Sequence, residues 1–117
     1  EDSVLKLMAK PSFRLFERLR VEFDNIVRCS GRKCELVPYF ISGHPGCGMR
    51  EMQRLARNPA LKGLYMDQVQ DFTPTPMTTS SVMFYTGLDP KNLDKVFVER
   101  DLERKKEQKS FFFRRGK

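Results

Sequence analysis

The chain has 117 residues, of which 39% are hydrophobic and 32% charged, so it is one modest domain or part of a larger one, not a two-domain enzyme. Basic residues outnumber acidic ones by 22 to 15, a net charge of +7, and no apolar run approaches the roughly 20 residues that cross a bilayer. Three cysteines, an odd number, favour free thiols in a reducing compartment, and we therefore expect a cytoplasmic protein with no membrane partner.

The first third of the chain predicts two helices. Residues 3–10 hold a short apolar cluster that predicts one or two helical turns, ended by Pro11. From Ser12, a good N-cap, apolar residues recur every third or fourth position, which predicts a helix that ends near Gly31. The members of this stripe are Phe13, Phe16, Leu19, Phe23, Ile26 and Val27.

The middle of the chain predicts an α/β arrangement. Residues 35–44 form a strand pattern that is apolar on both faces, which is typical of a strand buried between the layers of a parallel sheet. A glycine-rich turn then leads into a helix over residues 49–57, and residues 66–72 predict a second short strand. The interior of the chain is therefore predicted to alternate strand, helix and strand.

The last third is less regular. Residues 80–86 have the composition of a strand but fit a lid or an extended loop equally well, and residues 96–98 fit a last edge strand. From residue 101 the chain is an irregular tail, too charged to fold without something to lie on, and Phe111–Phe113 is its single anchor. Acidic residues interleaved with the bases nevertheless favour a solvated helix with mixed charge over a phosphate-binding tail. We divide the chain into residues 1–100 and a charged extension, 101–117.

The residue types would allow two kinds of chemistry, a zinc site and a serine hydrolase. Cys29, Cys34, His44 and Cys47 are zinc-ligand types, but an extended segment would separate Cys34 from His44 by on the order of 33 Å, which argues against a metal site. A hydrolase could use Ser42 and His44 with Asp67 or Asp71. Side chains two positions apart on a strand stand parallel, at roughly 6–7 Å between Cα atoms, which is too far for a good hydrogen bond from Ser42 to His44. A structural role for His44 is therefore favoured.

The turn Gly43–Gly48 is the most informative local feature. Glycines where a strand ends and a helix begins let the backbone approach a ligand closely, and the helix start offers unpaired amides. Ligands of parallel α/β proteins gather at the carboxyl ends of the strands. This turn therefore predicts where a binding site would lie.

Four blocks of sequence, in this order and spacing, resemble the C-terminal half of YgiQ-like radical S-adenosylmethionine proteins. The blocks are Val4–Met8 with Lys10-Pro11, Leu36–Gly46, Asp67–Pro76 and Tyr85–Pro90. The resemblance covers most of residues 3–100. It implies a fragment of a partial (β/α) barrel in which residues 35–44 form the fifth strand and residues 67–72 the sixth, parallel to it.

The resemblance also implies cofactors and a partner. The CxxxCxxC loop that binds a 4Fe-4S cluster in that family is absent here, so the implied partner is a missing N-terminal part of the same polypeptide. The implied function is the C-terminal portion of a radical S-adenosylmethionine enzyme of unknown substrate, contributing to the S-adenosylmethionine-binding wall. We expect no cofactor to bind to this chain alone, and the isolated chain to be inactive.

Site residues follow from the GxIxGxxE pattern that such enzymes often show on the fifth strand. Ile41 and Gly43 match this pattern, whereas Tyr39 and Gly46 replace its first Gly and its Glu. Gln70 and Phe72, at the end of the sixth strand, are implied as further neighbours of the nucleoside. His44 is the candidate for the substrate side.

Two other classes of function stay open. We do not expect nucleic acid as a partner, but a small basic RNA-binding module would use the basic residues of the tail with the phenylalanines as stacking platforms. Those residues are Arg104, Lys105, Lys106, Lys109, Arg114, Arg115 and Phe111–Phe113. A structural fragment that associates with itself through exposed strand edges is the other alternative.

Overall fold

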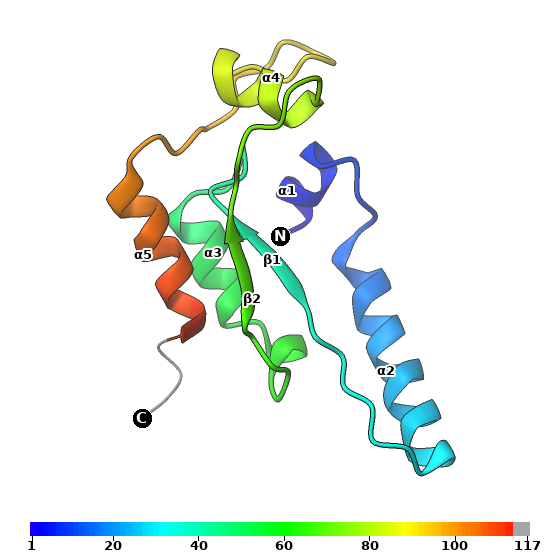
Figure 1. The fold of residues 1–117 in the computed structure, drawn as a ribbon. Helices are drawn as coiled ribbons and strands as arrows, with labels where there is room; N and C mark the ends of the chain where they lie inside the picture. The colour runs from blue at the N-terminus through cyan, green and yellow to red at the C-terminus, as the bar shows by residue number, and fades with distance from the viewer. Residues whose placement is uncertain (114–117) are drawn as a thin grey trace.

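A computed structural model describes residues 1–113 and shows a two-stranded parallel sheet (Figure 1). Strand β1 spans Tyr39–Ser42 and strand β2 spans Gln68–Asp71, paired in register from Tyr39 opposite Gln68 to Ser42 opposite Asp71. The parallel pairing agrees with the prediction, but both strands are shorter than predicted. Pro38, which has no N–H to donate, directly precedes β1 and limits it.

Three of the helices lie where the sequence predicts them. They are α1 (Asp2–Leu7), α2 (Phe13–Ser30) and α3 (Met49–Ala56). The Ser12 hydroxyl accepts the N–H of Arg14 at the start of α2, and Gly31 ends this helix with a φ of 64°. At the start of α3, the carboxylate of Glu51 accepts the N–H of Gly48 at 2.9 Å. A short 3-10 turn, η1 (Pro59–Leu61), follows α3.

The prediction for residues 80–86 was wrong, because this segment is helical. Helix α4 spans Thr79–Thr86, with Thr78 accepting the N–H of Ser81 at one end and Gly87 closing the other at a φ of 71°. Caps at both ends outweigh the strand composition of so short a segment. Residues 96–98 form no strand either, and the antiparallel bridge in this region joins Leu88 to Lys95.

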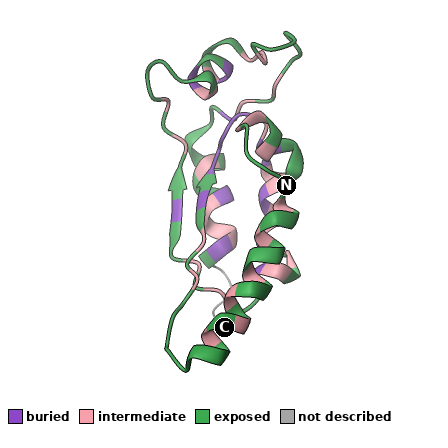
Figure 2. Cartoon of the chain, turned by 90° about the vertical axis from the view of Figure 1, so that its right-hand side faces the viewer, coloured by how far each residue is buried: buried purple, intermediate pink, exposed green. Residues whose placement is uncertain are grey.

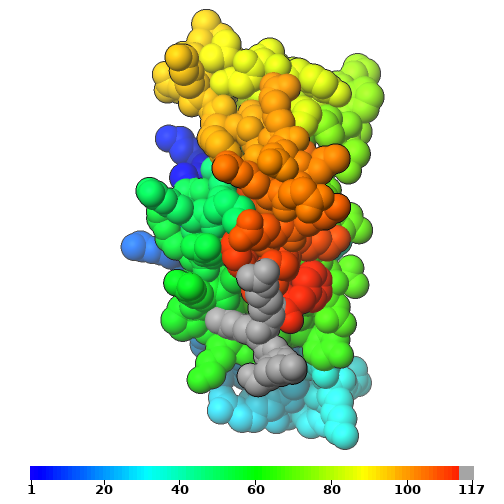
Figure 3. Space-filling model, turned by 90° about the vertical axis from the view of Figure 1, so that its left-hand side faces the viewer, coloured from blue at the N-terminus to red at the C-terminus, as the bar shows by residue number. Residues whose placement is uncertain are grey.

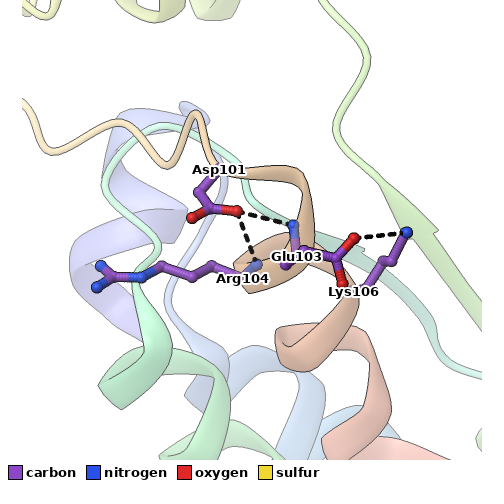
Figure 4. A network of polar contacts seen from close by, with 4 residues as sticks. All are labelled: Asp101, Glu103, Arg104 and Lys106. Atoms are coloured by element: carbon purple, nitrogen blue, oxygen red, sulfur yellow. Dashed lines mark hydrogen bonds and ion pairs between the residues drawn. The ribbon is translucent and has the colours of Figure 1, made fainter.

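The charged tail forms a helix, α5 (Leu102–Phe113), so the prediction of an irregular segment was wrong and that of a helix is confirmed. This helix is not merely solvated, because it packs on α3 and on both strands. Asp101 caps it, because its carboxylate accepts the N–H groups of Glu103 and Arg104 (Figure 4). In Figure 3, α5 fills the space between α3 and β2. Helix α5 thus packs on the part of the chain before the boundary predicted at residue 100. Residues 114–117 of the predicted extension lie outside the described residues.

The core lies between one face of the sheet and helices α3 and α5, and α1 and η1 each add a buried residue to it. Its buried members are Val4, Phe40, Cys47, Met52, Ala56, Leu61, Val69 and Phe112. The other face of the sheet is open, as the exposed colour along the strands shows (Figure 2). Tyr39 is 57% exposed and Ile41 37%. The expectation that β1 is buried on both faces is therefore wrong for the described residues, because no second layer covers Tyr39 and Ile41.

Phe112 should be an energetic anchor of α5. Its ring is 4% exposed and stacks on Phe40 with 4.8 Å between the ring centroids, whereas the adjacent Phe113 is 52% exposed. We expect Phe112→Ala to lower the free energy of unfolding by about 3 kcal/mol, and Phe113→Ala to change it by less than about 1 kcal/mol. Urea denaturation followed by circular dichroism measures both; equal losses would contradict this packing.

Candidate functional site

Ile41 and Gln70 lie side by side on the open face of the sheet. They are register partners on β1 and β2, and both are exposed. Tyr39 and Gln68, also register partners and also exposed, extend the same face toward the start of the strands. The structure therefore brings together two of the predicted cofactor-contacting residues, one from each strand. This open face offers an aliphatic side chain next to an amide that can both donate and accept hydrogen bonds.

The carboxyl ends of the two strands are tied together by hydrogen bonds. The hydroxyl of Ser42 donates to the carboxylate of Asp71 at 2.7 Å, and the N–H of Phe72 donates to the carbonyl of Ser42 at 2.7 Å. Ser42 is fully buried. It is therefore a structural residue bonded to Asp71, and the arrangement of a serine hydrolase is not formed here.

His44 is buried and fully partnered, which does not fit its predicted role on the substrate side. Only 3% of the residue is exposed. Its Nδ1 lies 2.9 Å from the carbonyl oxygen of Pro45, and its Nε2 lies 2.9 Å from the hydroxyl of Ser80. Because a carbonyl can only accept, Nδ1 carries the proton and Ser80 donates to Nε2. His44 therefore connects the turn after β1 to the start of α4.

Phe72 joins the end of β2 to α4 through aromatic contacts. Its ring centroid lies 5.0 Å from that of His44, in an edge-on arrangement, and 5.7 Å from that of Phe84. The ammonium group of Lys105 lies 4.9 Å from the centre of the Phe84 ring. Phe72 is half-buried in this cluster, which lies just beyond the strand that carries Gln70.

Gly43 is buried and has the left-handed backbone conformation, with a φ of 67°. Its N–H donates to the side-chain oxygen of Gln108 on α5 at 3.0 Å. Sequence reasoning missed Gln108, because one polar residue in a charged helix shows no periodic signal. Of the predicted contacts, Gly43 thus has its amide directed to α5 and not to the open face.

The three cysteines do not converge on a metal site. Cys29 and Cys34 are exposed, and Cys47 is buried. Desolvation by burial, reinforced by the charge of Glu51, raises the pKa of Cys47 to about 11, so its thiol keeps its proton at neutral pH. Within residues 1–113, no three or more side chains of His, Cys, Asp or Glu are grouped as metal ligands.

The predicted RNA-contacting residues are only partly accessible. Arg104 and Lys106 are exposed, whereas Lys105 is half-buried over Phe84. Phe112 is buried against Phe40 and cannot serve as a stacking platform in this structure. Arg114 and Arg115 lie outside the described residues.

Comparison with known proteins gives a consistent group of relatives. The chain is 44% identical over 112 residues to a UPF0313 protein of Bacteroides thetaiotaomicron and 44% identical over 112 residues to one of Porphyromonas gingivalis. It is 41% identical over 113 residues to a UPF0313 protein of Methanosarcina acetivorans. Its homologues are UPF0313 proteins. These alignments cover 96%, 96% and 97% of this chain, but only 18%, 18% and 15% of the three UPF0313 proteins.

Residues 67–115 match a family described as a domain of unknown function (DUF3362), a segment that contains β2, α4 and α5 and begins well after β1. The chain thus spans less than a fifth of the length of these UPF0313 proteins. No solved structure matches it significantly. Among the described residues, none of the helices has the length and apolar character needed to traverse a bilayer.

His44 should make stability depend on pH, since it is the single histidine of the chain. Desolvation lowers its pKa below the ordinary value of 6.5. As the pH falls below 6.5, the unfolded chain takes up a proton that the folded chain resists, so the free energy of unfolding decreases. We expect the melting temperature to fall more between pH 7 and pH 5 for the wild type than for His44→Gln. Parallel curves for the two proteins would contradict a buried neutral His44.

Proposed function

We propose that this chain forms part of the S-adenosylmethionine-binding wall of a radical S-adenosylmethionine iron–sulfur enzyme, whose cluster ligands lie elsewhere in a longer polypeptide. The observation that carries the proposal is the pairing of Ile41 with Gln70 on the sheet face that no helix within residues 1–113 covers. Both residues belong to blocks that resemble that family of enzymes. The aliphatic side chain would contact the adenine base, and the amide would satisfy polar atoms of the nucleoside.

The one-sided cover of the sheet supports a barrel wall. In a (β/α) barrel, helices lie outside the strands and the opposite strand faces point inward. Here, α3 connects β1 to its parallel neighbour β2 and packs with α5 on one face only (Figure 1). The open face, with Ile41 and Gln70, would be the inward one.

A groove beside β1 favours the presence of further strands of the proposed barrel at this edge of the sheet. It has a volume of about 580 Å³ and is lined mainly by apolar residues of α1, α2, β1 and α3, among them Phe16, Leu19 and Tyr39. Figure 1 shows α2 beyond the edge of β1 that does not pair with β2. Because parallel strands are joined by right-handed crossovers, the strand before such a helix would pair with this free edge. The greater length of the UPF0313 relatives provides chain for it.

The cluster does not fit the residues described here. Cys47 is buried and protonated, Cys29 and Cys34 are exposed, and the three are not grouped. Bound in the intact enzyme, the cofactors would supply the radical chemistry for hydrogen abstraction from a substrate. The residues of this chain bind and orient the nucleoside part, while the buried turn after β1 keeps the strand ends in place.

Binding of S-adenosylmethionine to the full-length protein that contains this chain tests the proposal. An aspartate at position 41 would lose its hydration when the adenine base binds against it. We therefore expect Ile41→Asp to weaken the affinity for S-adenosylmethionine at least about tenfold. The matched control is Val82→Asp on α4, where the valine is also exposed, at 46%. Titration calorimetry on anaerobically reconstituted protein measures both. A wild type that does not bind S-adenosylmethionine, or equal affinities for the two variants, would overturn the proposal.

The isolated 117-residue chain provides a second test. Because its described cysteines do not converge, we expect reconstitution with iron and sulfide to give no 4Fe-4S chromophore and the chain to show no turnover. Absorbance spectroscopy and iron analysis measure the outcome. One cluster per chain would show that the ligands are present here and would contradict this division of roles.

A further inference from the structure

Gln108 is a fully buried amide on a charge-rich helix. None of its surface is exposed, although α5 carries five charged residues before it. Its Oε1 accepts the N–H of Gly43 at 3.0 Å, and its Nε2 lies 3.5 Å from the carbonyl oxygen of Cys47. These two main-chain groups lie near opposite ends of the turn that follows β1. One planar side chain thus holds both ends of the turn.

The backbone of Gly43 is shaped by the same helix. Its φ of 67° is a conformation that residues with a side chain rarely adopt. A Cβ placed on Gly43 would lie 3.3 Å from Cγ of Lys105, so the aliphatic part of that lysine covers the glycine. Gly43 directly follows the last residue of β1 and lies two residues after Ile41. Helix α5 therefore fixes how the chain leaves β1.

The docking of α5 does not depend on Gln108 alone. Phe112 anchors the helix on Phe40 of β1, and Asp101 caps its start. Replacing Gln108 by an apolar residue of similar size should therefore leave the helix in place and remove only the two polar contacts. The buried N–H of Gly43 would then lack the Gln108 acceptor, which favours a different conformation of the turn.

We propose that Gln108 is a positioning residue for S-adenosylmethionine binding, because it holds the buried Gly43–Cys47 turn and thereby sets the position of the carboxyl end of β1, where Ile41 would contact the nucleoside. This inference rests on the proposed function for its ligand. Helix α5, which the sequence predicts to be a charged extension, then contributes to the binding wall by positioning the end of β1. Its contact with the turn joins residues 65 positions apart in the chain.

The test uses the full-length protein and three variants. Gln108→Met removes both polar contacts at similar volume, and Gln108→Glu retains an acceptor for the Gly43 N–H. Phe112→Leu removes part of the stacking on Phe40 and serves as the structural control, because it disturbs the packing of α5 while leaving both hydrogen bonds from Gln108 to the turn available. We expect Gln108→Met to weaken S-adenosylmethionine binding about tenfold, Gln108→Glu to recover part of this loss, and Phe112→Leu to leave the affinity within about twofold.

Hydrogen exchange of the peptide that contains residues 43–47, measured without ligand, gives a second readout. We expect faster exchange in Gln108→Met than in the wild type and in Phe112→Leu. Unchanged exchange in Gln108→Met, or a loss of affinity no larger than that of Phe112→Leu, would overturn the inference. If the wild type binds no S-adenosylmethionine, the proposed function fails, whereas the exchange measurement still decides whether Gln108 sets the turn.

Discussion

The structure depends on a parallel sheet that, within residues 1–113, is covered on one face only. Parallel strands are normally buried on both faces, because the crossovers that connect them place helices against the sheet. Here Phe40 and Val69 are buried beneath α3 and α5, whereas Ile41 and Gln70 remain exposed on the other face. Both outer strand edges are also unpaired within the described residues. The apolar stripe of α2 likewise contains no buried residue.

The turn after β1 is specified by hydrogen bonds more than by apolar packing. Ser42, His44 and Gln108 are all buried, and each has its side chain bonded to a group on another segment. His44 favours its neutral form, and the thiol of Cys47 keeps its proton. Buried polar groups are costly unless they are paired, so a set in which each member has a partner selects one conformation of the chain. That conformation places the end of β1 relative to both α4 and α5.

The elements that could be predicted from the sequence are those whose periodic patterns and capping residues lie within or next to the element itself. Helix α2 has a regular stripe with Ser12 before it and Gly31 after it, and both caps form as the residue types predict. The parallel pairing of β1 and β2 likewise follows from two short strand patterns separated by a helix. Helix α4 could not be predicted from composition, because the bonds that cap it at Thr78 and Gly87 decide the outcome for eight residues rich in strand formers. The side-by-side placement of Ile41 and Gln70 follows from the predicted strands, whereas the burial of His44 depends on Ser80, a contact across 36 positions.

Helix α5 shows why a charge-rich segment can be hidden from sequence reasoning and still belong to the core. Its inward positions include Lys105, Gln108 and Phe112, spaced by three and four residues as on one face of a helix. Only one of the three is apolar, so a search for hydrophobic periodicity finds no stripe. The lysine covers Gly43 with its aliphatic stem, and the glutamine bonds to the main chain of the same turn. This face of α5 contacts Gly43 and two main-chain groups of the turn after β1. Such contacts leave no pattern in the sequence of α5, so the face can be identified only from the structure. The contacts of α5 with this turn, and not its charge-rich composition, therefore explain why the helix packs on the sheet.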